Sequence, residues 1–312
     1  MDTLTPSDTL DSGITQEPTP PQTKNTKAFS FTTLLRHLCY PLLMLAVCLT
    51  LFIGFTFDID FGLCNMVFLV GTIAYLALCE RLIPYKKQWH PTAKEWGRDA
   101  IYLILTMMGG ASAVAVVFAI AAVVSPKEST LGLWVEVPIA ILLTSLGSYI
   151  FHRAGHDIPF LWRFHGIHHA ADKINVSNNA LNHIADVFGR RLLAQLPLIL
   201  LGISTPALFI VSIFNTAQGY FSHANVDVKI GWLNYIVGSP EQHRLHHSKD
   251  LAEAGHFSVD ITLWDFLFKS YFWKKGKQPK EIGVTNRASF PPSNNIWKNI
   301  IHPLRRNITY RQ

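Results

Sequence analysis

Charged residues are scarce in this 312-residue sequence, at 15% of the chain, whereas they make up about a quarter of a typical soluble protein. Apolar residues account for 49%. This balance excludes a disordered or fibrous chain and argues against an ordinary soluble enzyme. The composition instead predicts a membrane protein with a substantial polar part. Its formal net charge of +6 suits contact with anionic lipid, and we expect no nucleic-acid partner.

Cysteine is also scarce. The four cysteines are Cys39, Cys48, Cys64 and Cys79. All of them lie in or beside apolar runs, and no two form a CxxC pair. We therefore expect neither a disulfide framework nor a thiolate metal site.

Long apolar runs, in contrast, are plentiful. Four are long enough to span a bilayer, which takes about 20 residues; they cover residues 40–57, 61–79, 100–124 and 131–151. A fifth, at 192–221, is too long for one span and too short for two. We interpret it as a re-entrant helical hairpin, interrupted at Ser204-Thr205-Pro206, whose irregular tip needs protein cover.

The placement of Lys and Arg predicts how these helices are oriented. Positive side chains precede the first run, follow the second and flank the hairpin, where Arg190 and Arg191 come just before it. Because short positive loops stay in the cytoplasm, both termini and the segment after the fourth run are expected there. The sequence thus predicts an all-α polytopic membrane protein with about four transmembrane helices, a re-entrant hairpin and a cytoplasmic histidine-rich cap. A bacterial inner membrane and the endoplasmic reticulum both suit this arrangement.

Histidine is concentrated in one part of the chain, where ten of the 14 lie between positions 152 and 247. Two of these, His183 and His223, stand singly. The other eight form three clusters: His152 with His156, then His165, His168 and His169, then His243, His246 and His247. Spacings of three and four residues put the imidazoles of each cluster on one face of a helix.

These clusters predict metal binding, because imidazoles packed together without a ligand would leave buried nitrogens unsatisfied, at about 1–3 kcal/mol each. One tetrahedral zinc takes three or four protein ligands, fewer than the clusters offer. Two metal ions are therefore expected, with positions left open for oxygen and substrate. Imidazole binds iron, zinc, copper and nickel alike, so the ligand type does not choose the metal.

Two other classes of protein are alternatives. A histidine-rich metal transporter would line a path within its spans with histidines, whereas here the histidines follow the fourth span. The four long spans also contain almost no ionisable residues. A zinc-dependent membrane hydrolase would be expected to carry a His-Glu-x-x-His motif, which this sequence lacks.

The order of the motifs carries a resemblance to a known family. His-x3-His, His-x2-His-His, a singlet and His-x2-His-His-Ser follow one another, together with Phe221-Ser-His-Ala-Asn225 and Leu263-Trp-Asp-Phe-Leu-Phe268. Over about residues 140–273 this pattern resembles the fatty acid hydroxylase and sterol desaturase superfamily of membrane enzymes. The resemblance implies a non-haem di-iron centre that uses O2 to oxidise a C–H bond of a lipid, fatty acyl or sterol-like. It does not distinguish hydroxylation from desaturation.

The resemblance also implies which residues bind the two iron ions. They are His152, His156, His165, His168, His169, His243, His246 and His247, with His223 as a ninth ligand and His183 as a tenth. Glu241 and Asn182 flank ligands and are candidates for orienting them. Because the sequence contains no GxGxxG motif, and nothing in it resembles a haem or flavin domain, a separate electron donor is implied, a ferredoxin or a cytochrome b5-like protein.

By these patterns the chain is expected to consist of four parts. Residues 1–29 are rich in Thr and Pro and are expected to be a disordered tail. Transmembrane helices follow at 30–139, then the hydroxylase-like catalytic domain at 140–273 and a basic C-terminal tail at 274–312.

Overall fold

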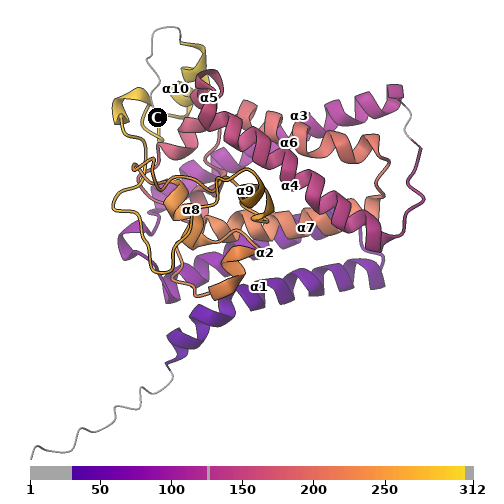
Figure 1. Cartoon of the computed structure of the whole chain (residues 1–312), viewed down its shortest axis with the longest axis horizontal. Helices are drawn as coiled ribbons and strands as arrows, with labels where there is room; N and C mark the ends of the chain where they lie inside the picture. The colour runs from indigo at the N-terminus through magenta and orange to yellow at the C-terminus, as the bar shows by residue number, and fades with distance from the viewer. Residues whose placement is uncertain (1–29, 125–126, 306–312) are drawn as a thin grey trace, which may run out of the picture.

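The structure is a computed structural model that describes residues 30–124 and 127–305 (Figure 1). The predicted disordered tail, residues 1–29, lies outside the described residues. In the described ranges the regular structure is helical, and strand-like pairing is limited to isolated bridges such as that between Pro84 and Val226. The predicted all-α class is confirmed.

Four long helices make up most of the bundle: α1 (Phe31–Thr56), α2 (Phe61–Leu82), α3 (Ala93–Val124) and α4 (Leu133–Asp157). All four are long and apolar enough to cross a membrane, which confirms the four predicted spans. Even α2, with 22 residues, extends for about 33 Å at 1.5 Å per residue, enough for a hydrocarbon core of about 30 Å. Large apolar side chains such as Phe118 and Val123 point away from the protein, as lipid-facing residues do.

The fifth apolar stretch forms a hairpin of two helices, α6 (Ile184–Leu200) and α7 (Thr205–Ser222). The backbone N–H of Ser129 donates to the carbonyl of Gly202 at 2.9 Å, and the Ser204 hydroxyl donates to Glu136. The tip of the hairpin therefore reaches the connection between α3 and α4. The hairpin is longer than the sequence suggests, because α6 begins at Ile184, well before the apolar run.

Helix α6 packs closely against two neighbours, and Figure 1 shows it between α3 and α4. Two glycines make this possible. A Cβ on Gly109 of α3 would lie 2.7 Å from the carbonyl oxygen of Ile184, and one on Gly147 of α4 would lie 2.6 Å from that of Leu193. Small residues at such crossings let the backbones of membrane helices approach.

Short helices gather at one end of the bundle and form a cap: α5 (Pro159–His169), α8 (Pro240–His246), α9 (Leu263–Leu267) and α10 (Ile296–Ile301). The first turn of α1 lies at this same end in Figure 1. Residues 274–305 pack on the cap as well. The N–H of Gly283 donates to the carbonyl of His247 at 2.9 Å, and Phe290 contacts Trp162.

Candidate metal centre

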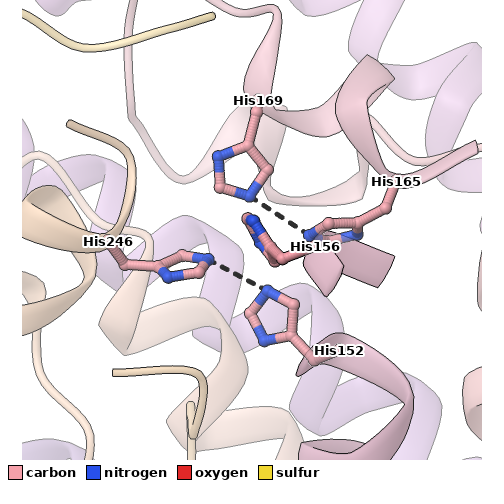
Figure 2. Close-up of side chains that lie close together, drawn as sticks. All are labelled: His152, His156, His165, His169 and His246. Atoms are coloured by element: carbon pink, nitrogen blue, oxygen red, sulfur yellow. Dashed lines mark hydrogen bonds between the residues drawn. The ribbon is translucent and has the colours of Figure 1, made fainter. Parts of the chain in front are cut away.

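Nine of the ten predicted ligands meet in two groups. The first histidine group is His152, His156, His165, His169 and His246, and the second is His168, His223, His243 and His247. Within each group the possible ligand atoms all lie within 4.8 Å of one another. Figure 2 shows the five rings of the first group converging on a common centre.

The local helices account for this convergence. The last turns of α4 carry His152 and His156, and Pro159 starts α5 directly afterwards, so the chain turns back beside them. Gly155 leaves room for this approach, because a Cβ there would lie 3.1 Å from the Cβ of His165. His223 follows the last residue of α7.

Helices α5 and α8 each serve both groups. From α5, His165 and His169 enter the first group and His168 enters the second. From α8, His246 enters the first group, whereas His243 and the residue that caps the helix, His247, enter the second. The groups are consequently adjacent: the rings of His169 and His247 stack with centroids 4.1 Å apart.

Inside the groups, ring nitrogens face ring nitrogens. The Nε2–Nε2 distances are 3.0 Å for His246 and His152, 3.1 Å for His169 and His165, and 3.0 Å for His247 and His243; the first two appear as dashed lines in Figure 2. A neutral imidazole has one N–H and one lone pair, so two facing nitrogens share at most one useful hydrogen bond. A metal ion between them would be bound by both lone pairs.

Backbone carbonyls determine the tautomer of three of these rings. The carbonyl of Phe257 accepts from Nδ1 of His152 at 2.5 Å. In the same way, the carbonyl of Leu181 accepts from His168 at 3.2 Å, and that of Asn175 accepts from His223 at 3.0 Å. Because a carbonyl can only accept, Nδ1 carries the hydrogen and Nε2 keeps its lone pair. The Nε2 of His223 is buried and has no hydrogen-bond partner, as expected of an atom that binds a metal.

Burial keeps His223 and His246 neutral. It lowers the pKa of His223 to about 4 and that of His246 to about 3. Their lone pairs are therefore available throughout the physiological pH range. Among the described residues, neither group includes a carboxylate. The donor set fits two transition-metal ions bound by neutral imidazoles, and iron belongs to the metals that imidazole suits.

Asp186 belongs to the site although no motif in the sequence indicates it. Its Oδ1 lies 3.4 Å from Nδ1 of His165, and its Oδ2 accepts from Arg190 at 3.0 Å. Asp186 is 3% exposed, so this contact is shielded from solvent. A carboxylate behind a ligating imidazole orients the ring and raises its basicity. The only signal in the sequence is the four-residue spacing of Asp186 and Arg190, which is common on any helix.

His183, the tenth predicted ligand, lies outside both groups. Its Nδ1 accepts from the N–H of Ala185 at 3.0 Å, as the N-cap of α6, and its Nε2 donates to the carbonyl of Ile300 at 3.0 Å. Both ring nitrogens are thus occupied, and no lone pair is left for a metal. The proposed orienting residues also have other partners: Glu241 accepts from Asn234, and Asn182 donates to Asn179.

Two cavities reach the histidines from different sides. A cavity of about 470 Å³ lies between α2, α3, α4, α6 and α7 and touches His152, His165, His168 and His243. A smaller one, about 150 Å³, lies on the cap side and touches His156, His169 and His246. The larger has the size of a typical small-molecule site.

Comparison with known proteins agrees with this geometry. Residues 137–270, which contain both histidine groups, match the family model for fatty acid hydroxylases. Ornithine lipid hydroxylase OlsE of Rhizobium tropici is 31% identical over 265 residues, 81% of this chain and 80% of that protein. The chain belongs to the fatty acid hydroxylase family. The resemblance seen in the sequence is confirmed.

More distant members of this family match a shorter region. Alkylglycerol monooxygenase of Danio rerio is 28% identical over 135 residues, 43% of this chain and 30% of that protein. The human alkylglycerol monooxygenase is 25% identical over 134 residues, 42% of this chain and 29% of that protein. No solved structure is significantly similar to the chain.

Proposed function

We propose that this membrane protein is a non-haem di-iron oxidoreductase that uses O2 to hydroxylate a C–H bond of a lipid. The observation that carries the proposal is the position of the two adjacent histidine groups. They lie at the end of a cavity that runs between apolar, membrane-length helices. A lipid bound in this cavity would lie against four of the histidines, His152, His165, His168 and His243.

The metal and the protein would contribute different parts of the reaction. Iron bound by the nine imidazoles would supply oxygen activation. The chain itself holds the metals through neutral nitrogens, orients three of the rings through backbone carbonyls, and positions the lipid in the cavity. We favour hydroxylation over desaturation because the relatives are named as hydroxylases and monooxygenases. One oxygen atom would enter the C–H bond and the other would leave as water.

The reaction consumes two electrons and two protons, which we assign to a separate donor of the ferredoxin or cytochrome b5 type. The basic loops would attract such acidic proteins. The same loops favour a cytoplasmic location of the cap and of both termini.

The test is oxidation of lipid by cells that express the chain and are supplied with isotopic oxygen. Lipid extracts analysed by mass spectrometry should contain a labelled hydroxyl group. The variants His168→Ala and His246→Ala should lose this product and bind less iron, while His37→Ala, an exposed residue of α1, should match the wild type. Loss of two hydrogens without label would indicate desaturation. An unchanged lipid profile with a competent donor present would refute the proposal.

A further inference from the structure

Unpartnered polar side chains line the large cavity. Five of them make no hydrogen bond with any residue in the described part of the chain: Thr144, Ser148, Gln195, Asn215 and Thr216. The hydroxyl of Thr144 is buried without a partner, which is unfavourable unless a ligand satisfies it, and the other four side chains are partly exposed. A cavity for a hydrocarbon chain alone would have an apolar wall. This wall fits the polar part of a ligand.

One face of α6 forms part of the same wall. Val187, Arg191, Ala194 and Gln195 all line the cavity, and their spacing of three and four residues puts them on one side of the helix. The sequence suggested that Arg190 and Arg191 belong to the membrane surface ahead of the hairpin. In the structure both belong to α6, which starts at Ile184, and both line the cavity.

The charged side chains of this wall differ in whether they have a partner within the protein. Arg190 donates to Asp186 at 3.0 Å. Asp260 accepts from the Ser145 hydroxyl at 2.6 Å and from the N–H of Ile261 at 2.7 Å. Arg191 has neither an ion pair nor a hydrogen bond with any residue that the structure describes. The cavity therefore offers one cationic group that is free to bind.

Arg191 is an exposed residue that also forms part of the cavity wall, so its guanidinium is accessible to a ligand in the cavity. Its planar fork of N–H donors matches the two oxygens of a carboxylate or phosphate. We propose that Arg191 binds an acidic oxygen of the lipid substrate, a carboxylate or a phosphate, and thereby selects lipids whose polar part is anionic or zwitterionic. This inference deepens the proposed function, because it assumes that the cavity is where the substrate binds.

The position of Arg191 along α6 sets where such a lipid would lie. Asp186, which contacts His165, is five residues earlier on the helix, about 7.5 Å along its axis. Both Arg191 and His165 line the same cavity. A lipid held by its acidic group would therefore present carbons close to that group to the metal centre, rather than the far end of its chain.

The test compares ligands that differ only in the acidic group, with the purified full-length chain in detergent and no reductant present. Hexadecanoate is compared with hexadecanol, and dipalmitoyl phosphatidate with dipalmitoylglycerol; inorganic phosphate alone shows whether a free anion suffices. Binding is measured by native mass spectrometry and by quenching of tryptophan fluorescence. The variants are Arg191→Gln and Arg191→Lys. Arg287→Gln, which removes an exposed charge outside the cavity, is the matched control.

We expect the wild type and Arg287→Gln to bind at least one acidic lipid about tenfold more tightly than its neutral analogue. Which lipid pair shows this preference distinguishes a carboxylate from a phosphate. Arg191→Gln should lose the preference, and Arg191→Lys should keep part of it. The proposal is overturned if the wild type shows no preference, if inorganic phosphate alone binds as tightly as the lipid, or if Arg191→Gln retains the preference. Because binding is measured without turnover, an inactive wild type that keeps the preference would refute only the proposed function.

Discussion

At the scale of single residues, His168 and His183 show how the same side chain can have two roles. His168 keeps its Nε2 lone pair inside the second histidine group, whereas both nitrogens of His183 are occupied by backbone partners. We predict that His168→Ala lowers the iron bound per chain from about two ions to about one. His183→Asn should retain the wild-type iron content, because Asn is also a good N-cap.

Elemental analysis of the purified variants checks this prediction, with His37→Ala as the control for purification. Equal loss of iron from His168→Ala and His183→Asn would contradict the assignment of nine ligands. An iron content of one per chain in the wild type would contradict the dinuclear site.

Asp186 gives a second prediction at this scale. Removing the negative charge next to Nδ1 of His165 should weaken iron binding without removing a ligand. For Asp186→Asn we expect a loss of about 10–100-fold in metal affinity, the usual effect of losing such a carboxylate. Competition with an iron chelator measures it. Gln195→Leu, on the same helix and in the cavity wall, should leave the affinity unchanged; an equal loss there would point to general damage of α6.

The parts of the site that can be predicted from the sequence are those whose residues lie close together along the chain. The three clusters can be assigned because positions three and four apart share a helix face in any tertiary fold. The single histidines cannot be assigned in this way. His223 binds a carbonyl of the segment before His183, and His183 itself caps a helix. The partnership of Asp186 with His165 depends on how α6 packs against α5, which no local pattern encodes.

At the scale of elements, the tip of the α6–α7 hairpin is a sensitive point. Gly202 has a φ of +67°, and a Cβ there would lie 2.0 Å from the carbonyl oxygen of Lys127. Gly276 has a similar φ, +78°, but no neighbour within 4 Å of such a Cβ. Both alanine variants carry the cost of a left-handed residue, about 1–2 kcal/mol. Gly202→Ala should lose about 1–3 kcal/mol more, because the tip must move.

Thermal unfolding in detergent, followed by circular dichroism, compares Gly202→Ala with Gly276→Ala. Identical melting temperatures for the two variants would show that the hairpin tip does not press against the α3–α4 connection.

The sequence predicts the long helices well and their ends poorly. Apolar runs identify the four spans and the interruption at Ser204-Thr205-Pro206. They miss the first turns of α6, because Asp186, Arg190 and Arg191 break the hydrophobic pattern. Asp186 contacts His165 of α5, and Arg190 pairs with Asp186 on α6 itself. Arg191 lines a cavity whose other walls come from other parts of the chain.

At the scale of the whole molecule, the cap and the α3–α4 connection lie at opposite ends of the bundle. We predict that Lys275→Cys is labelled from the cytoplasmic side and Thr130→Cys only from the other side, since the positive charges lie with the cap. Both positions are exposed. Labelling of sealed vesicles with an impermeant maleimide, in a Cys48→Ala background that removes the one exposed cysteine in the described residues, measures this. Labelling of both sites from one side would contradict the topology.

The charges on α6 have a consequence for how the chain assembles in the membrane. Asp186, Arg190 and Arg191 lie within one 17-residue helix, and each charge near the centre of an isolated span opposes insertion by about 2.5–3.5 kcal/mol. We therefore expect α6 to insert only together with α7 and only after α3 and α4 are in place. Gly109 of α3 and Gly147 of α4 leave the room that α6 needs to pack against them. Helices α3 and α4 must then insert before α6. A defect in α3 or α4 would keep an intact α6 at the membrane surface, and the metal site would not form.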